Sequence, residues 1–513
     1  MSQQGGPSGS QRPFMKCFNG RLIYSVTLIA LSQLNFGMDQ GAFSGTQAMT
    51  AFERKFGVWD SAKGKYIIEP YFLSLLNSLN YIGFAVGLVS GNLISRKWGR
   101  RRCMLIMCGW ALIAAIILVT SQHKAQMLVG RIIAYIYIGM ELALVPVLQS
   151  ELVPARVRGF VVGTYQSGLL FGQLIMALIC QGTSNIKSDA AFRIPLGLFF
   201  IIPSILGCGV WFLPESPRWL LMNERPDDAM KSLTLLRQGA FSQEEIEDEL
   251  KEIKSTIDVT VDRGRFMEQF QGTNLRRTLI VIGVNVFLQL TGQNFSSVYG
   301  TVFIKSLNTI NPFAMTSINT AINIVMVFIT QGLTDRTGRV PLMVSGAVIQ
   351  CGALFTMGGL GTVSDPNMHI KKAITSMVTV FGVGFQLGWA PLSHVVAAEI
   401  PTTRLRDLTY ALGSVFNIVI QFAISFSIPY LLNAPYANLG SKVGFIFGST
   451  AFLAVIFSWF CIPECSGKTL EEIDELFLEG VAIKDFKKTR SNRHIERYEA
   501  EEKGLHVTHE EQA

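Results

Sequence analysis

The amino-acid sequence predicts an all-α integral membrane protein with twelve transmembrane helices, arranged as two pseudo-symmetric halves of six. Hydrophobic residues make up 49% of the 513 residues and charged residues only 16%, against about 25% charged in soluble globular proteins. Apolar runs recur along the whole chain, at lengths near the roughly 20 residues that one bilayer crossing needs. In addition, loop motifs of the first half recur in the second half.

The twelve predicted spans are apolar runs separated by glycine, proline or charged clusters. Their limits are about 22–43, 72–94, 103–121, 126–148, 160–183, 191–213, 276–304, 314–333, 341–361, 372–398, 407–432 and 441–462. An even number of crossings leaves both ends of the chain on one side. The loops after spans 2, 4, 8 and 10 hold arginine clusters, whereas the opposite loops hold few basic residues. The positive-inside rule therefore predicts that both termini are cytoplasmic.

Composition divides the chain into five parts. A polar N-terminal tail covers residues 1–21, and the first six-helix half covers 22–213. A linker follows at 214–274, where charged residues at helical spacing predict short cytoplasmic helices. The second half covers 275–463, and a charged cytoplasmic tail covers 464–513.

The net charge of +7 comes from basic residues in short loops between spans. It therefore reports membrane topology and does not indicate nucleic-acid binding. The soluble segments contain no catalytic triad, metal-ligand spacing, phosphate loop or ATP-binding domain. We expect a transporter and not an enzyme, without a cofactor or metal, whose contacts are the bilayer and a small solute. No motif indicates an oligomer, so a monomer is expected.

An internal repeat relates the two halves. Three pairs of positions mark it: Arg96 with Asp335, Glu151 with Glu399, and Pro214 with Pro463. The offsets are 239, 248 and 249 residues, and the order is kept. Two such halves around a site at the membrane midplane are the architecture of a secondary transporter.

Five motifs occur in a fixed order along the chain. They are Gly37-Met-Asp39-Gln-Gly41 in span 1, Gly130-Arg131 in span 4, Pro214-Glu-Ser-Pro-Arg218 after span 6, Gln289-Leu-Thr-Gly-Gln-Asn294 in span 7, and Gly467-Lys-Thr-Leu-Glu-Glu-Ile-Asp474 after span 12. Together they resemble the sugar porter family of the major facilitator superfamily over residues 21–477, and fungal members most of all. The resemblance implies the major facilitator fold, a plasma-membrane location, and uptake of a sugar or polyol by alternating access.

Amide side chains recur at helical spacing inside four spans. The pairs are Gln166 and Gln173, Gln289 and Gln293, Asn319 and Asn323, and Asn417 and Gln421. Amides that face lipid are costly, and a neutral, hydroxyl-rich solute needs donors and acceptors of this kind. We expect the pairs to face a polar cavity; the alternative is that they only join helices.

The resemblance selects the residues that bind the solute. It implies Gln166, Gln289, Asn294, Asn323, Phe385, Gln386 and Asn417. Gly292 is expected to let the span 7 helix break, as a moving gate requires. Tyr299 matches one of the family's two gate tyrosines.

Four positions depart from the family pattern: Leu288, Val298, His394 and Ile418. They change the shape and hydrogen bonding of the pocket, so glucose, a pentose, a disaccharide and a cyclic polyol acid all stay open. His394 either titrates or contacts the solute, or it packs against a neighbouring hydroxyl.

Asp39 lies in an apolar span, so it must be protonated, paired or hydrated. Arg131, at the start of span 4, is its expected partner. Similar proton-coupled members carry Asp and Arg at these positions, which implies symport driven by the proton gradient. The alternatives are a facilitative uniporter, a metabolite exporter, and a nutrient sensor, for which a longer tail is expected.

Glu141, a second acid in span 4, either joins the coupling pathway or pairs with a tyrosine such as Tyr135 or Tyr137.

The resemblance also implies that cytoplasmic charges form inter-helix salt bridges in the outward-facing state. They are Glu151, Arg158, Glu215, Arg218, Asp335, Arg339, Glu399, Arg406 and Glu464. Exposed pairs stabilise by only about 0–1 kcal/mol each, which suits a lock that opens in every cycle. The alternative is that these charges only enforce topology.

Overall fold

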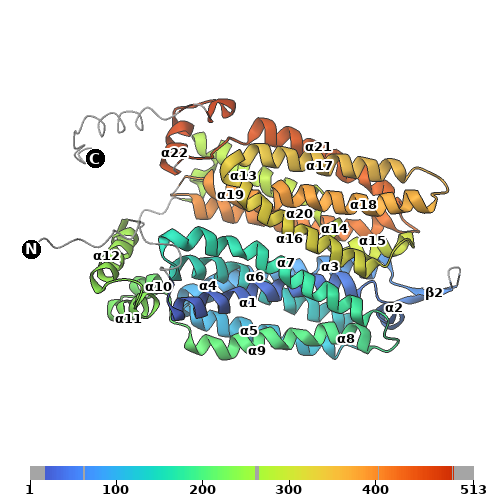
Figure 1. Ribbon diagram of the computed structural model, residues 1–513, viewed down its shortest axis with the longest axis horizontal. Coiled ribbons are helices and arrows are strands. Elements are labelled where there is room, and N and C mark those ends of the chain that lie inside the picture. The colour runs from blue at the N-terminus through green and yellow to red at the C-terminus, as the bar shows by residue number, and fades with distance from the viewer. Residues whose placement is uncertain are drawn as a thin grey trace, which may run out of the picture.

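The computed structural model describes residues 18–61, 64–259, 265–402, 404–468, 470–487 and 489. The described chain is a bundle of long helices that run along one common direction, with the first half of the sequence on one side and the second half on the other (Figure 1). Two large apolar clusters form the core. One contains Leu28, Met107 and Leu144 of the first half, and the other contains Met357 and Phe447 of the second half.

The first half consists of six long or paired elements. They are α1 (Gly20–Thr46), α3 (Pro70–Ser78) with α4 (Asn80–Trp98), α5 (Arg100–Val119), α6 (Lys124–Leu152), α7 (Ala155–Thr183), and α8 (Ala190–Gly197) with α9 (Ile201–Gly209).

The second half repeats this pattern with more interruptions. Its elements are α13 (Gly272–Leu290) with α14 (Gln293–Ser297) and α15 (Gly300–Leu307), α16 (Pro312–Thr337), α17 (Arg339–Leu360), α18 (Met368–Gly384) with the π-helix η6 (Phe385–Trp389) and α19 (Ala390–Glu399), α20 (Arg406–Leu432) and α21 (Val443–Cys461).

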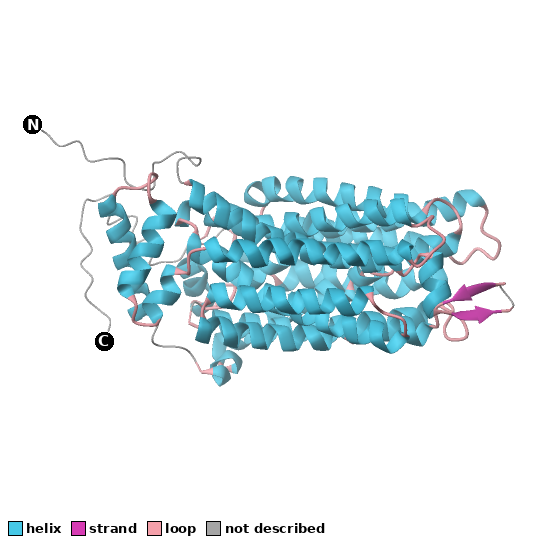
Figure 2. Cartoon of the chain, turned by 90° about the horizontal axis from the view of Figure 1, so that it is seen from below, coloured by secondary structure: helices cyan, strands magenta, loops and turns pink. Residues whose placement is uncertain are grey.

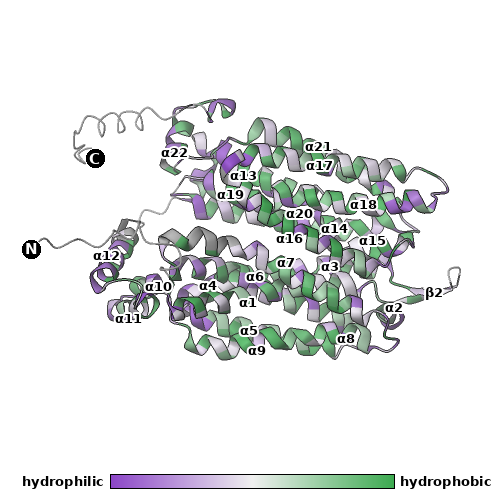
Figure 3. Ribbon diagram, in the orientation of Figure 1, coloured by the Kyte–Doolittle hydropathy of each residue, from purple (hydrophilic) through white to green (hydrophobic). Residues whose placement is uncertain are grey.

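The short elements lie at the two ends of the bundle. One end carries α2 (Thr50–Phe56) and an antiparallel pair of strands, β1 (Val58–Asp60) and β2 (Lys65–Ile67), drawn in magenta in Figure 2. We name it the hairpin end; the sequence did not predict these strands. The other end, the linker end, carries α10 (Pro217–Met222), α11 (Pro226–Arg237), α12 (Gln243–Val259) and α22 (Leu470–Leu478). Hydrophilic residues are concentrated in the helices of the linker end, whereas the bundle is mainly hydrophobic (Figure 3).

Ten helical segments among the described residues are long and apolar enough to cross a membrane. Helices α1 and α7 have 27 and 29 residues, which is also sufficient at about 1.5 Å per residue. Polar side chains such as Asn35 of α1 and Gln173 of α7 interrupt their apolar runs. With these two, the described bundle has the twelve predicted transmembrane helices.

Glycines let two pairs of helices in the first half approach closely. A Cβ on Gly37 of α1 would lie 1.8 Å from the carbonyl oxygen of Leu169 in α7. A Cβ on Gly87 of α4 would lie 2.1 Å from the carbonyl oxygen of Ile136 in α6. Small residues at such crossings allow backbones to pack tightly without a hydrophobic driving force. This packing fixes α1 and α7, which contribute the first half's share of the central cavity.

Candidate functional site

A cavity of about 190 Å³ lies between the two halves. Its wall is formed by α1 and α7 of the first half and by α13–α16, α18, η6, α19 and α20 of the second half. Both halves therefore contribute to one site, as expected for a secondary transporter built from two repeats.

Amide side chains dominate the polar part of this wall. Nine of them line the cavity: Gln40, Gln166, Gln173, Gln289, Gln293, Asn319, Asn323, Gln386 and Gln421. Serine and threonine hydroxyls, including those of Ser44 and Thr320, add further donors and acceptors. Among the described lining residues none is an aspartate, glutamate, lysine or arginine, and His394 is the one titratable side chain. The site is built for hydrogen bonds to an uncharged molecule.

Five of the seven residues predicted to bind the solute line the cavity. They are Gln166, Gln289, Asn323, Phe385 and Gln386. Asn294 and Asn417 do not line it; they lie behind the wall and bond to residues of other helices.

Asn417 of α20 orients Gln289 of α13. The Gln289 Nε2 donates to the Asn417 Oδ1 at 3.2 Å, and the Asn417 Nδ2 donates to the Oδ1 of Asn285 at 3.3 Å. The Oε1 atom of Gln289 is buried and has no hydrogen-bond partner among the described residues, and the same is true of Gln386 Oε1. An unsatisfied buried acceptor is costly unless a ligand donates to it.

The predicted break in span 7 is present at Gly292, which has a φ of 93° and separates α13 from α14. Beyond the break, the Asn294 Nδ2 donates to the Ser425 Oγ at 2.8 Å and to the Tyr81 Oη at 3.4 Å. Tyr299 is buried, and its hydroxyl donates to the Ser425 carbonyl oxygen at 2.8 Å. Asn294 and Tyr299 thus fasten the broken segment to α20, and Asn294 also reaches the first half.

Phe385 and Gln386 lie in the π-helix η6, within the second broken span. A π-helix widens one helical turn and leaves carbonyl groups free, and it is frequent at functional sites. Here the hydroxyl of Thr330 in α16 donates to the Gln386 carbonyl oxygen at 3.0 Å. This bond helps fix the backbone that carries two cavity residues.

Asp39 and Arg131 form the predicted pair inside the first half. The Arg131 Nη1 lies 3.0 and 2.9 Å from the two carboxylate oxygens of Asp39. Both residues are buried, with 5% and 2% of their surfaces exposed. The guanidinium also lies over the ring of Phe43, 3.5 Å from its centroid. The adjacent residue Gln40 lines the cavity, so the pair lies directly behind the cavity wall.

His394 and Tyr410 meet beside the cavity. The His394 Nδ1 and the Tyr410 Oη are 3.2 Å apart, and both side chains are exposed. This contact agrees with the interpretation that His394 packs against a neighbouring hydroxyl, and its place in the cavity wall also agrees with contact with the solute.

Apolar side chains of α7 and α16 pack together near the middle of the bundle, and polar side-chain contacts between the halves occur at the hairpin end. The Ser44 Oγ lies 3.0 Å from the Thr301 Oγ1, and the Lys305 Nζ of α15 lies 2.7 Å from a carboxylate oxygen of Glu53 in α2. The Ser74 Oγ of α3 donates to the Phe426 carbonyl oxygen of α20 at 2.7 Å. At the linker end, none of the ion pairs among the described residues joins the first half to the second: they lie within one half, within the linker, or, for Arg404 with Glu268, between the second half and the linker.

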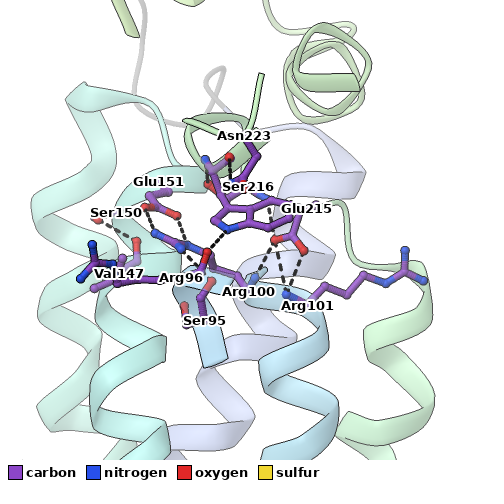
Figure 4. A network of polar contacts seen from close by, with 11 residues as sticks. Ser95, Arg96, Arg100, Arg101, Val147, Ser150, Glu151, Glu215, Ser216 and Asn223 are labelled. Atoms are coloured by element: carbon purple, nitrogen blue, oxygen red, sulfur yellow. Dashed lines mark hydrogen bonds and ion pairs between the residues drawn. The ribbon is translucent and has the colours of Figure 1, made fainter. Parts of the chain in front are cut away.

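One of those ion pairs joins Arg100 to Glu151, at 2.8 and 2.9 Å (Figure 4). The Glu215 carboxylate accepts the backbone N–H groups of Arg100 and Arg101 at the start of α5. Burial raises the pKa of the Glu215 carboxyl above its usual value, although these N–H groups and Arg100 act in the opposite direction. The indole of Trp219 donates to the Arg96 carbonyl oxygen at 2.9 Å.

The second half repeats this arrangement. Arg339 Nη2 lies 2.9 Å from Glu399 Oε1, and the Glu464 carboxylate accepts the backbone N–H groups of Arg339 and Val340 at 3.0 and 2.9 Å. Glu215 and Glu464 therefore bind helix N-termini in this structure. Of the charges expected in salt bridges, Glu151, Arg339 and Glu399 form ion pairs between helices, and each of these pairs lies within one half.

The remaining predicted charges have different outcomes. The side chains of Arg158 and Asp335 lie outside the described residues. Arg218 and Arg406 form no ion pair with a described acidic residue, and Arg406 has buried Nε and Nη2 atoms without a described partner. Arg100 was not predicted as a partner of Glu151. Arg100 lies 239 residues before Arg339, the same offset as between Arg96 and Asp335, so the internal repeat could have identified Arg100 as the equivalent of Arg339.

Comparison with known proteins places this chain among membrane transporters. The family described as "Sugar (and other) transporter" matches residues 25–477. The major facilitator-type transporter ecdD of Aspergillus rugulosus is 31% identical over 89% of this chain and 87% of that protein. The probable glucose transporter rco-3 of Neurospora crassa is 30% identical over 88% of this chain and 78% of that protein. The high glucose sensor RGT2 of Saccharomyces cerevisiae is 30% identical over 79% of this chain but only 54% of the sensor.

Solved structures show the same fold. The inward open conformation of the xylose transporter XylE from E. coli matches with a TM-score of 0.73 at 22% identity, over 89% of this chain and 99% of that chain. A peptide transporter, POT, matches with a TM-score of 0.58 at 13% identity, over 85% of this chain and 93% of that chain. At these identities the likeness is one of fold.

Proposed function

Because this chain belongs to the sugar transporter family, and is therefore a multi-pass membrane transporter, we propose that it takes up a neutral sugar or polyol by proton-coupled symport. The observation that carries the solute class is the cavity wall, with nine amides and no fixed charge among the described lining residues. Each amide can donate to one hydroxyl and accept from another. A charged solute would lose its hydration shell in this site without gaining a counter-ion.

The positions of the unsatisfied acceptors support a hydroxyl-rich solute. Gln289 of α13 and Gln386 of η6 both line the cavity and both have a free, buried Oε1 atom. Two sugar hydroxyls that donate to these atoms would satisfy them together. Such bonds give specificity, because an analogue without the hydroxyl leaves the acceptors unpaired.

The arrangement of contacts supports alternating access. The halves contact each other at the hairpin end through Ser44, Ser74 and Lys305, whereas none of the described ion pairs of the linker end joins the first half to the second. We infer that the linker end, whose neighbouring loops hold the basic clusters, is cytoplasmic together with both termini, and that this is the inward-facing state. The plasma membrane is the proposed location.

Proton coupling is supported by the Asp39–Arg131 pair. A proton that binds Asp39 abolishes its negative charge and leaves Arg131 without a counter-ion, which is costly in a buried site. The two helices α1 and α6 would then separate at this point. Since Gln40 and Ser44 of α1 line the cavity, such a movement reaches the solute.

Uptake in transporter-deficient yeast tests the proposal. Radiolabelled hexoses, pentoses, disaccharides, polyols and polyol acids are offered at acidic and neutral external pH, with and without a protonophore. We expect concentrative uptake of one neutral solute, its loss with the protonophore, and its loss in Gln289→Leu/Gln386→Leu. The matched control is Gln243→Leu at an exposed position of α12. Uptake that equilibrates regardless of the proton gradient would identify a facilitator, and uptake of charged solutes alone would overturn the solute class.

A further inference from the structure

Helix α6 carries a second buried acid, Glu141, which the Asp39–Arg131 pair does not involve. Its side chain is fully buried, at 0% exposure. The hydroxyl of Tyr165 in α7 donates to its Oε2 at 3.0 Å, and its Oε1 has no partner among the described residues. No described lysine, arginine or histidine forms an ion pair with it. The partner is thus Tyr165, and not Tyr135 or Tyr137.

The surroundings of Glu141 are polar but contain no cation. Tyr137, one turn earlier on α6, donates to the Ser32 carbonyl oxygen of α1 at 3.3 Å. Gln33 of α1 is fully buried, and neither polar atom of its amide has a described partner. The titratable groups that face this site are Tyr137 of α6, Tyr165 of α7 and, beside Tyr137, Cys108 of α5.

Glu141 and Arg131 occupy different levels of the same helix. Ten residues of α-helix correspond to about 15 Å along the axis. Helix α6 begins at the hairpin end, where Lys124 binds Glu69, and ends at the linker end, where the Leu152 carbonyl oxygen accepts from Arg237. Glu141 therefore lies about 15 Å closer to the linker end than the Asp39–Arg131 pair does.

Tyr165 connects Glu141 to the space between the halves. It is partly exposed and precedes Gln166, a residue of the cavity wall. Tyr410 of α20 lies near it across the boundary between the halves. Tyr410 in turn meets His394, which lines the cavity. When the two halves move relative to each other, the surroundings of Tyr165 and the hydration of Glu141 change together.

We propose that Glu141 is a second proton-binding site of the transport cycle. A buried carboxylate without a cation or a full set of hydrogen bonds is strongly disfavoured, so in this state Glu141 holds a proton on Oε1 and accepts a hydrogen bond on Oε2. When the cavity opens to water at Tyr165, the acid dissociates, the proton passes to water, and the hydrated carboxylate remains. The Tyr165 hydroxyl keeps its own proton throughout. This inference rests on the proposed proton-coupled transport. It adds to the Asp39–Arg131 pair a second proton-binding residue that lies nearer the linker end.

Infrared spectroscopy of the purified protein tests the protonation without any solute. We expect a carbonyl band of a protonated carboxylic acid at neutral pH, which is lost in Glu141→Gln and shifted in Tyr165→Phe. The band should persist in Asp39→Asn, and in the control Glu247→Gln on the exposed face of α12. If Glu141→Gln does not fold, the shift of the carbonyl band in Tyr165→Phe shows whether the band belongs to Glu141. A spectrum that neither Glu141→Gln nor Tyr165→Phe changes overturns the proposal.

Proteoliposomes with an internal pH dye test the role in transport. We expect Glu141→Gln to keep solute exchange between labelled and unlabelled pools but to carry one proton fewer per solute than the wild type. An unchanged number of protons per solute would mean that Glu141 only fastens α6 to α7. If the wild type moves no solute, the proposed function fails, whereas the infrared band still decides whether Glu141 holds a proton.

Discussion

Glu215 and Glu464 hold equivalent places in the two halves. The Glu215 carboxylate accepts the backbone N–H groups at the start of α5, and Glu464 does the same at the start of α17. Each lies against a glycine with a positive φ, 93° at Gly99 and 95° at Gly338. A carboxylate at a helix N-terminus is favoured by the free N–H groups and by the helix dipole. The two halves thus share not only a pattern of charges but also the same local structure, in which a carboxylate binds a helix N-terminus beside a glycine with a positive φ.

The first prediction concerns Gly99. Its φ of 93° and ψ of 166° lie in a region that is essentially restricted to glycine. A Cβ there would also lie 2.5 Å from the Glu215 Oε2. We expect Gly99→Ala to lower the free energy of unfolding by about 1–3 kcal/mol, measured as a fall in the melting temperature of purified protein. Gly109→Ala in α5 is the control, because nothing lies within 4 Å of its Cβ. Equal melting temperatures for the two variants would contradict the expectation.

Replacements of Glu215 separate its charge from its hydrogen bonds. Glu215→Gln keeps an acceptor oxygen, and burial already raises the pKa of this carboxyl, so we expect a small loss of thermal stability. Glu215→Ala leaves the N–H groups of Arg100 and Arg101 without their acceptor, which costs about 1–3 kcal/mol. Melting curves of both variants give the comparison. A larger loss in the glutamine variant than in the alanine variant would show that the charge, and not the acceptor, matters.

The two equivalent ion pairs differ in burial. The side chains of Arg100 and Glu151 are 9% and 7% exposed, whereas those of Arg339 and Glu399 are 14% and 22% exposed. Removal of one partner from a buried pair leaves an uncompensated charge, at a cost of about 3–5 kcal/mol. We therefore expect Arg100→Ala to destabilise the protein more than Arg339→Ala. The double variant Arg100→Ala/Glu151→Ala should recover part of the loss, and no recovery would argue against the ion pair as the cause.

The sequence was sufficient to predict the spans, the Asp39–Arg131 pair and the break at Gly292. Each depends on a strong local signal, namely an apolar run, an isolated charge in an apolar helix, or a glycine among amides. The strands at 58–60 and 65–67 were not predicted, because a short hairpin outside the bundle has no comparable pattern of hydropathy.

The direction of side chains could not be predicted in the same way. Asn294 and Asn417 were expected in the cavity, yet they bond to Ser425 and Asn285 behind its wall. Helical spacing shows which residues share a face but not how the helix is rotated after a break. The sequence predicted a tyrosine partner for Glu141 such as Tyr135 or Tyr137 on α6, whereas Tyr165 lies on the neighbouring helix α7.

The hydrogen bond between Gln289 and Asn417 leads to a prediction about the affinity for the transported solute. Gln289 contacts the cavity directly, and Asn417 only orients it at 3.2 Å. We expect Gln289→Ala to raise the KM for the transported solute about fivefold, since one hydrogen bond contributes about 1 kcal/mol. Asn417→Ala should raise KM less, and the double variant should resemble Gln289→Ala. Additive effects in the double variant would indicate that Asn417 contacts the solute itself.

Asp39→Asn tests the coupling. The amide keeps the size of the side chain and its hydrogen-bonding capacity toward Arg131 but cannot bind and release a proton. We expect this variant to lose concentrative uptake driven by an acidic exterior while it keeps exchange of labelled solute across proteoliposomes at equal pH. Exchange reports the movement of the loaded carrier, so its retention shows that the variant folds and binds solute. Serine in place of Gln243, at an exposed position of α12, serves as a control that should alter neither measurement. Concentrative uptake that survives in Asp39→Asn and still collapses with a protonophore would place the coupling site elsewhere, and Glu141 would then be the acid to replace next.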